Sequence, residues 1–300
     1  MSKPSIILRI VSLSTINMPI LSLSPLSFLF LIIILFTSKP QADNNDQKFH
    51  YFCDQNNDRG NYITGDSYHN SLRIALISLT YNSKIDYGFY NTNNGQNNDK
   101  VNVIGICRGD INPDDCRKCL VGSRFNLTQA CPNKKEAIGW YEDEKCMLRY
   151  SDRSIMGLNE IGPAYFAWNL NNATMADQFN ILVKQLLNDL RSKAINGDSH
   201  RKYVVGTLPG PSSNQIIYGL VQCTPDLSGP QCDDRLLQSI AEVSRCCSNR
   251  IGARIVRPSC NLRFETSYQF YQPKAKPASH LPWWTTLFLK VIVRWEYLSS

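Results

Sequence analysis

The chain has 300 residues, with 32 lysines and arginines against 25 aspartates and glutamates, and a net charge of +7. This positive charge is dispersed and forms no lysine or arginine run of the kind that follows phosphates, so we expect no nucleic acid partner. The four histidines lie near none of the cysteine clusters. We therefore expect no zinc or other metal site, no cofactor, and neither a Ser-His-Asp nor a Cys-His catalytic set, which together predict that the chain is not an enzyme.

Residues 1–42 have the composition of a signal peptide. Lys3 and Arg9 supply weak positive charge, residues 28–36 form an uninterrupted apolar block, and the small residue Ala42 precedes a polar run. The apolar block is shorter than the roughly 20 residues that a spanning helix needs, which favours a cleavable leader. An uncleaved signal anchor is the alternative, because the segment before Met18 is unusually long.

The next hundred residues show helical and strand patterns in alternation. Residues 49–53 are aromatic-rich and typical of an edge strand, and residues 68–79 place apolar side chains at helical spacing after Asp66 and Ser67, which can cap a helix. Residues 91–99 are polar and without periodicity, so a surface loop is expected there. A strand is also predicted at residues 101–106, a short helix at 114–125 after Pro113, and two strands at 137–141 and 146–150.

The second half repeats this plan. Residues 153–176 interrupt the periodicity and are expected to form a linker between a first domain, residues 49–152, and a second domain, residues 177–271. In the second domain, helices are predicted at 179–190 and 232–244, and strands at 202–206, 215–221, 253–256 and 261–265. Two helices with a sheet of hairpin-sized steps predict an α+β fold for each domain.

Residues 272–300 form a C-terminal tail of different character. Its apolar part is broken by Lys290, Arg294 and Glu296, and its longest uncharged run is far shorter than a spanning helix requires. Aromatic and basic residues alternate in it, which would suit a segment lying flat on a membrane surface.

The cysteines reveal an internal repeat. Three of them find a partner 116 positions later, and a fourth finds one at a spacing two residues shorter. A register shared by four cysteines predicts a tandem repeat of one small domain. In a chain that enters the secretory pathway, eleven cysteines are best read as a disulfide framework. The matched pairs are Cys107 and Cys223, Cys116 and Cys232, Cys131 and Cys247, and Cys146 and Cys260.

Two sequons, Asn126-Leu-Thr128 and Asn172-Ala-Thr174, are candidate N-glycosylation sites in a secreted chain. The alternative for each is an unused acceptor.

The motifs around these cysteines resemble a known plant family. They are the Cys-x8-Cys-x2-Cys spacing from Cys107, Cys146-Met-Leu-Arg-Tyr, Gly219-Leu-Val-Gln-Cys-Thr-Pro-Asp-Leu-Ser, Cys246-Cys-Ser-Asn-Arg-Ile-Gly-Ala-Arg and Pro258-Ser-Cys-Asn-Leu-Arg-Phe-Glu. Residues 49–271 are thereby similar to a tandem of ginkgobilobin-homologous, or stress-antifungal, domains. The resemblance implies an α+β fold, with two small disulfide-bonded domains that each contain a five-stranded antiparallel sheet and two helices.

The resemblance also implies a disulfide pattern. For the first domain it gives Cys53 to Cys131, Cys107 to Cys116 and Cys119 to Cys146, each worth roughly 3 to 4.5 kcal/mol by loop entropy. In the second domain only Cys223 to Cys232 carries over. Arg235 stands where the fourth cysteine is expected, so Cys246, Cys247 and Cys260 remain unassigned. Five cysteines cannot all pair internally, which leaves a free thiol, a non-standard bridge or a link to another chain.

A sugar site known in the family carries over in part. The antifungal founder binds mannose through an asparagine after the first cysteine, an arginine seven residues after the fifth, and a glutamate five residues after the sixth. In the second domain Arg254 and Glu265 match these spacings, while the asparagine cannot be placed. The alternative interpretation of Arg254 and Glu265 is a cross-strand ion pair that supports the sheet. In the first domain the corresponding residues are Asp54, Ile138 or Trp140, and Ser151, so that site is expected to be lost.

The resemblance implies a secreted, apoplastic, non-catalytic recognition or defence module. Its expected partners are a cell-wall glycan or other mannose-containing ligand, another receptor ectodomain, or a second copy of the chain. The alternative is a truncated extracellular region of a cysteine-rich receptor-like kinase, associated with the plasma membrane. The sequence contains no kinase Gly-rich loop, His-Arg-Asp or Asp-Phe-Gly motif.

Overall fold

A computed structural model describes residues 49–54, 59–81, 88–197 and 202–272. The expected signal peptide and nearly all of the expected C-terminal tail lie outside these residues. None of the described helices is both long and apolar enough to cross a membrane.

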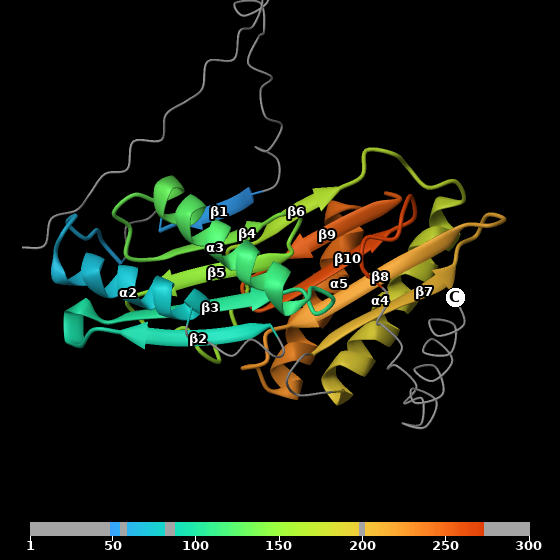
Figure 1. The fold of residues 1–300 in the computed structure, drawn as a ribbon. Coiled ribbons are helices and arrows are strands. Elements are labelled where there is room, and N and C mark those ends of the chain that lie inside the picture. Colours follow the sequence, from blue (N-terminus) through green and yellow to red (C-terminus); the bar gives the residue numbers. More distant parts are fainter. Residues whose placement is uncertain (1–48, 55–58, 82–87, 198–201, 273–300) are drawn as a thin grey trace, which may run out of the picture. The chain divides into compact units, whose positions relative to one another are not determined.

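The first repeat contains five strands and two α-helices (Figure 1). Its sheet has the strand order β1-β4-β5-β3-β2, and all of its strand pairs are antiparallel. The short 3-10 helix η2 (Asn97–Asp99) lies between β2 and β3. The elements are β1 (Phe49–Cys53), α2 (Ser67–Tyr81), β2 (Phe89–Asn94), β3 (Val101–Cys107), α3 (Pro113–Ala130), β4 (Ala137–Tyr141) and β5 (Cys146–Ser151).

The second repeat has the same topology. Its sheet has the order β6-β9-β10-β8-β7, again with antiparallel pairs. The prediction of an α+β tandem with two five-stranded antiparallel sheets and two helices per repeat is therefore confirmed. The elements are β6 (Tyr165–Trp168), α4 (Ala176–Asn196), β7 (Tyr203–Pro209), β8 (Ile216–Cys223), α5 (Gly229–Cys246), β9 (Gly252–Val256) and β10 (Cys260–Glu265).

Two segments differ from the sequence expectation. Residues 91–94, expected in a surface loop, belong to edge strand β2, because backbone pairing with β3 overrides the low strand propensity of asparagine. Strand β6 lies inside the segment expected to be a linker, and it pairs with β9 as the first strand of the second sheet. Its four residues are too few to show a period in sequence.

Helices α2, α3 and α5 begin at recognisable side-chain caps. Asp66 Oδ1 accepts a hydrogen bond from His69 N, and Asn112 accepts one from Asp115 N ahead of Pro113. Ser228 and Gln231 form a reciprocal capping box at the start of α5. These bonds satisfy backbone donors that the first helical turn leaves without partners.

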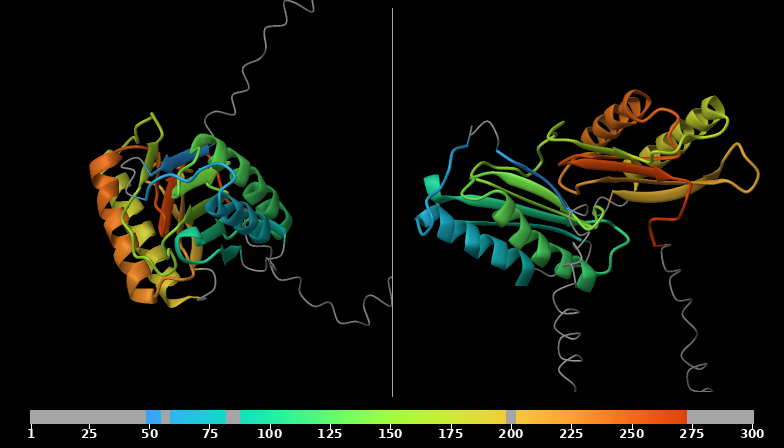
Figure 2. Two further views of the ribbon diagram at one scale, coloured as in Figure 1. Left: turned by 90° about the vertical axis from the view of Figure 1, so that its left-hand side faces the viewer. Right: turned by 90° about the horizontal axis from the view of Figure 1, so that it is seen from above.

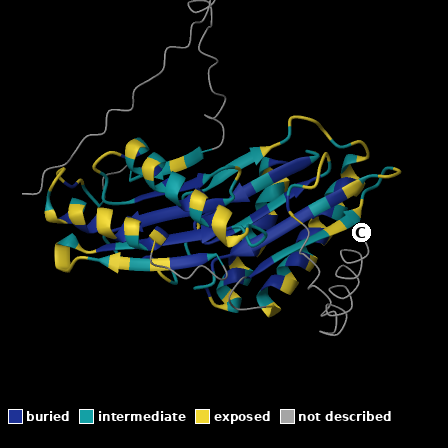
Figure 3. Ribbon diagram, viewed as in Figure 1, coloured by how far each residue is buried: buried dark blue, intermediate teal, exposed yellow. Residues whose placement is uncertain are grey.

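Each sheet carries its two helices on one face (Figure 2). In β3, Val101 and Val103 pack toward α2 and α3, whereas Ile104 and Ile106 belong to a separate apolar cluster on the opposite face. This alternation follows from the two-residue period of a strand, and both faces of the central strands β3, β4 and β5 are buried (Figure 3).

The cluster on the helix-free face joins the two repeats. It includes Trp140 and Met147 from the first sheet and Val256 from the second. A buried hydrogen bond from Gln222 Nε2 to Cys107 O, 3.0 Å long, adds a polar link. The helix-free faces therefore form the contact between repeats, and residues at its margin can come from both.

Candidate functional site

Strands β9 and β10 bring Arg254 and Glu265 to the same face of the second sheet. Arg254 pairs with Arg263 and Glu265 pairs with Gly252, and alternate residues of a strand share a face. Both residues line a hollow of about 210 Å³ on the side away from the helices. The structure thus brings together the two residues that the sequence proposed for a sugar site.

Asn169 also lines this hollow, at a position that cannot be counted from a first cysteine in the sequence. Trp168 pairs with Ala253 as Cys53 pairs with Ala137, so Trp168 occupies the position of the missing first cysteine. Asn169 N donates to Gly252 O at 2.8 Å, as Asp54 N donates to Glu136 O at 3.1 Å. Asn169 is therefore the residue after the first-cysteine position, and it lines the same hollow.

The missed asparagine had a weak sequence signal. Its position in the family is counted from a first cysteine, which the second repeat lacks. Comparing the aromatic run at residues 165–168 with the run at 49–53 would have aligned Trp168 with Cys53 and Asn169 with Asp54.

Arg254 forms no pair with Glu265 in the described part of the chain. Its Nη1 donates to Glu144 Oε2 at 3.1 Å and lies 3.4 Å from Asp143 Oδ1, both in the β4–β5 turn of the first repeat. The Arg254 guanidinium also lies 5.6 Å from the centre of the Tyr165 ring. The cross-strand ion pair considered as the alternative is replaced by a pair between repeats, because the turn carries two acidic residues at this margin.

Burial raises the pKa of Glu144, and the positive charges of Arg254 and Arg263 offset this only in part. Burial would lower the pKa of Arg254, but the interactions with Glu144, Tyr165 and Asp143 together outweigh it and the pKa is raised. Arg254 therefore stays charged, with 18% of its side chain exposed at the edge of the hollow.

Glu265 is held by the backbone that follows it. Its Oε1 accepts hydrogen bonds from Thr266 N at 2.9 Å and Ser267 N at 3.1 Å, and the residue is buried. These donors fix one carboxylate oxygen, and Gly252, which has no side chain, leaves room for the carboxylate.

In the first repeat, side chains occupy the place that corresponds to the hollow of the second repeat. Glu136 stands where the second repeat has Gly252, opposite Ser151 in place of Glu265, and the strand register puts Ile138 rather than Trp140 at the position of Arg254. The Glu136 carboxylate accepts hydrogen bonds from Arg149, Arg153 and Ser151 at 2.8 to 2.9 Å. An internal ion pair network therefore takes the place of an open polar site.

An aromatic side chain completes the hollow in the second repeat. Tyr268 lines it and is 52% exposed, whereas Trp168, at the rim, pairs with Ala253 and so alternates to the other face of the sheet from Arg254. An amide, a guanidinium and a carboxylate offer donors and acceptors together, and a flat ring offers an apolar face. This combination suits a small polyhydroxylated ligand.

The cysteines of the two repeats differ. Bridges join Cys53 to Cys131, Cys107 to Cys116, and Cys119 to Cys146 in the first repeat. In the second, Cys246 is bonded to Cys247, and the Cys223 sulfur contacts the sulfurs of both Cys232 and Cys260. Arg235, at the position of Cys119, is buried and bonds to Asp234 and Gln238.

The two sequons lie in different surroundings. Asn126 is half-buried within α3, whereas Asn172 is exposed in the segment between β6 and α4, where its Oδ1 accepts a hydrogen bond from Arg250 at 3.0 Å.

Known proteins share this architecture. The sequence profile of the salt stress response/antifungal family matches residues 52–153 and 168–267. The tandem DUF26 ectodomain of the Arabidopsis thaliana cysteine-rich receptor-like protein PDLP8 superposes with a TM-score of 0.61 at 23% identity, covering 73% of this chain and 96% of that structure. This likeness establishes the fold.

Closer sequence relatives are of two kinds. Cysteine-rich receptor-like protein kinase 29 of Arabidopsis thaliana is 36% identical over 81% of this chain, but the match covers only 35% of the kinase. Cysteine-rich repeat secretory protein 38 of the same plant is 32% identical over 78% of this chain and 90% of its own length. The antimicrobial ginkbilobin-2-like protein of Castanea crenata is 34% identical over 80% of this chain and 93% of its own length. With two copies of the matching domain in tandem, the chain belongs to the salt stress response/antifungal family.

Proposed function

We propose that this chain is a non-catalytic extracellular recognition module whose second repeat binds a terminal sugar of a glycan. The observation that carries the proposal is the convergence of Asn169, Arg254 and Glu265 on one hollow beside Tyr268. The ligand class is a hexose such as mannose, which the family resemblance implies.

The chemistry of the hollow supports a pyranose. The Asn169 amide and the Arg254 guanidinium can donate to neighbouring hydroxyls, and the outer oxygen of Glu265 can accept from one. The exposed ring of Tyr268 can pack against the apolar face of the sugar ring. At about 210 Å³ the hollow is smaller than the roughly 300–1,000 Å³ of sites for drug-sized ligands, so it suits a single sugar residue.

The affinity for a monosaccharide should be low. Arg254 already bonds to Glu144, and sugar hydroxyls must lose water before they bind. We expect a dissociation constant on the order of millimolar, which corresponds to about 4 kcal/mol. A glycan that presents many terminal sugars would raise the apparent affinity by multivalency.

The same role fits either cellular context. The match to nearly the full length of a secretory protein supports a secreted, apoplastic module. The match to about a third of the length of the receptor-like kinases supports the alternative, in which this chain corresponds to the ligand-binding region of a membrane receptor.

A titration of the isotope-labelled protein with methyl α-mannoside, followed by NMR, tests the proposal. We expect shifts at the Arg254 side chain and the Tyr268 ring, both of which line the hollow, and these shifts should be lost in Asn169→Ala and Glu265→Gln. Asn188→Ala is the matched control, because this amide lies on α4 and donates to Lys184 O within the same helix. Binding that survives both pocket variants, or no response to mannoside and mannan in the wild type, would overturn the proposal.

A further inference from the structure

The cysteines of the second repeat cannot all be paired. The chain has eleven cysteines, and six of them form the three bridges of the first repeat. Cys246 and Cys247 are bonded to each other. A disulfide uses one bond from each sulfur, so Cys223, Cys232 and Cys260 together form one bridge and keep one thiol.

The origin of the extra thiol lies in the strand register. Cys223 pairs with Cys260 across β8 and β10, as Cys107 pairs with Cys146 across β3 and β5. In the first repeat α3 supplies a separate partner for each strand cysteine. In the second repeat α5 supplies only Cys232, because Arg235 replaces the other partner.

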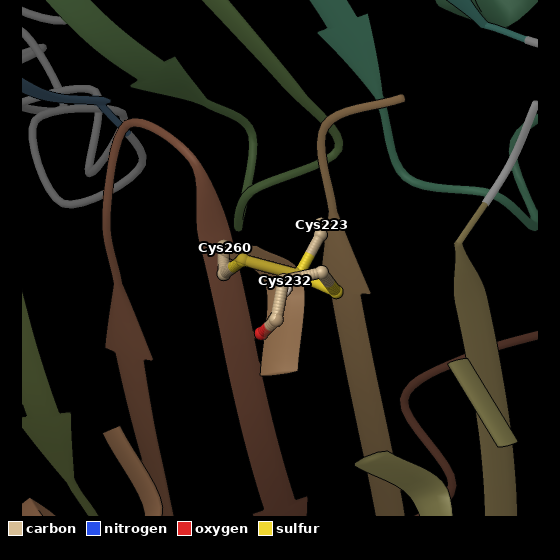
Figure 4. A group of neighbouring side chains, drawn as sticks. All are labelled: Cys223, Cys232 and Cys260. Atoms are coloured by element: carbon tan, nitrogen blue, oxygen red, sulfur yellow. Dashed lines mark hydrogen bonds between the residues drawn. A yellow bond between two sulfur atoms is a disulfide. The ribbon is translucent and has the colours of Figure 1, made fainter. Parts of the chain in front are cut away.

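The three sulfurs therefore meet at one point. Cys223 at the end of β8, Cys232 on α5 and Cys260 at the start of β10 direct their side chains toward one another (Figure 4). Their sulfur atoms all lie within 4.8 Å of one another, and the residues are at most 1% exposed. A thiol is thus held beside a disulfide in a site that excludes bulk solvent.

We propose that these three cysteines form an internal thiol–disulfide exchange site in which Cys223 is the shared partner. The thiolate of Cys260 attacks the Cys223 sulfur, the bond between Cys223 and Cys260 forms, and the bond between Cys223 and Cys232 breaks. Cys232 leaves as a thiolate and takes up the proton that Cys260 released. The reverse reaction restores the first isomer, and no oxidant or reductant is consumed.

Exchange changes how α5 is attached to its sheet. With Cys223 bonded to Cys232, the helix is covalently linked to β8. With Cys223 bonded to Cys260, only non-covalent contacts hold it, such as the packing of Leu236 and Ile240 and the hydrogen bond from Arg257 to Ser239, since the Cys246–Cys247 bridge lies within the end of the helix itself. In the first repeat Cys116 and Cys119 both link α3 to strands. The second repeat therefore has a helix whose attachment is switched by exchange.

The burial of the three cysteines limits the rate of exchange between the two isomers. Exchange needs a thiolate, and an apolar environment disfavours that charge, so the two isomers should interconvert slowly, over minutes to hours. Burial also keeps external thiols and oxidants away from the sulfurs, which favours exchange within the cluster over reaction with other molecules.

Disulfide mapping of the oxidised protein tests this proposal. The secreted protein is quenched in acid, unfolded and alkylated at low pH so that bonds do not reshuffle, and its peptides are identified by mass spectrometry. We expect both Cys223–Cys232 and Cys223–Cys260 linkages, with one alkyl label per chain divided between Cys260 and Cys232. The first-repeat cysteines, which have separate partners, are the internal control and should give one linkage each.

Two variants isolate the isomers. Cys260→Ser should show complete loss of the Cys223–Cys260 linkage and of the label, and Cys232→Ser should show complete loss of the Cys223–Cys232 linkage. Amide hydrogen exchange in α5 should be faster in Cys232→Ser than in Cys260→Ser, because only the latter keeps the tether. A single linkage in the wild type, a disulfide-linked dimer through the third cysteine, or three unlinked cysteines with a bound metal would each overturn the proposal.

Discussion

Gly252 and Glu265 face each other across strands β9 and β10, and the glycine leaves the space that the glutamate carboxylate occupies. A Cβ atom on Gly252 would overlap both oxygens of Glu265. Gly252→Ala should therefore displace the carboxylate and abolish saccharide binding, at a cost of roughly 1–3 kcal/mol in unfolding free energy from overpacking. Denaturant unfolding and a mannoside titration of the same variant measure the two effects.

A second glycine serves as the control for this substitution. A Cβ atom on Gly229, in the first turn of α5, would meet Ile195 O at 3.5 Å, an ordinary contact. Gly229→Ala should leave saccharide binding unchanged. If Gly252→Ala bound sugar as well as Gly229→Ala does, the carboxylate of Glu265 would have no part in the site.

The periodic parts of the fold were predictable from sequence, and the exceptions have physical causes. Helix α4 was expected because its apolar residues recur at helical spacing, and the strands beside Cys107 and Cys146 were marked by apolar runs. Strand β2 was missed because its asparagines form a strand only through the backbone bonds that β3 offers. The pairing that makes β2 a strand therefore depends on β3 and is not visible in the sequence of β2 itself.

The residues of the candidate site were predictable only where their positions could be counted from a cysteine. Arg254 and Glu265 were found by counting from Cys247 and Cys260, whereas Asn169 follows a tryptophan and needed the strand pairing to be recognised. The partner of Arg254 could not be foreseen, since Glu144 is distant in sequence and approaches only through the contact between repeats.

Restoring the missing cysteine should stabilise the second repeat. In Arg235→Cys the new thiol would stand toward Cys260 as Cys119 stands toward Cys146, whose Cα atoms are 6.1 Å apart. By loop entropy the new bridge is worth roughly 3.5 kcal/mol, so the melting temperature should rise by several degrees under oxidising conditions. An equal change in reductant would show that the gain comes from removing the buried arginine and that no bridge has formed.

Glu136 should make the first repeat sensitive to acid. Burial alone would raise the pKa of this carboxyl, but hydrogen bonds from Arg153, Arg149 and Ser151 lower it from 4.5 to about 2. Because the folded value lies below the unfolded one, the stabilisation is complete above about pH 4.5 and disappears as the pH falls toward 2, with at most roughly 3 kcal/mol involved.

Urea unfolding at a series of pH values from about 2 to about 7 measures this loss of unfolding free energy. Glu136→Gln should be less stable than the wild type at neutral pH, and the gap should close in acid. Glu142→Gln is the matched control, because Glu142 makes a more exposed pair with Lys145 in the next turn. A gap that stayed constant with pH would mean that Glu136 titrates in the folded chain as it does in the unfolded chain.

Glu144, at the contact between the repeats, should show the opposite pH dependence. Its pKa is raised because burial outweighs the attraction of Arg254 and Arg263, so the folded state binds a proton more tightly than the unfolded state. The contribution of Glu144 to the unfolding free energy is then most favourable below the ordinary glutamate pKa of about 4.3 and declines as the pH rises through the folded value.

Glu144→Gln removes this titration. The difference in unfolding free energy, wild type minus variant, should therefore fall as the pH rises from about 4 toward neutrality. A difference that increases over the same range would show that the two arginines lower the pKa of Glu144, and that the ion pair between the repeats outweighs the cost of burying its carboxylate.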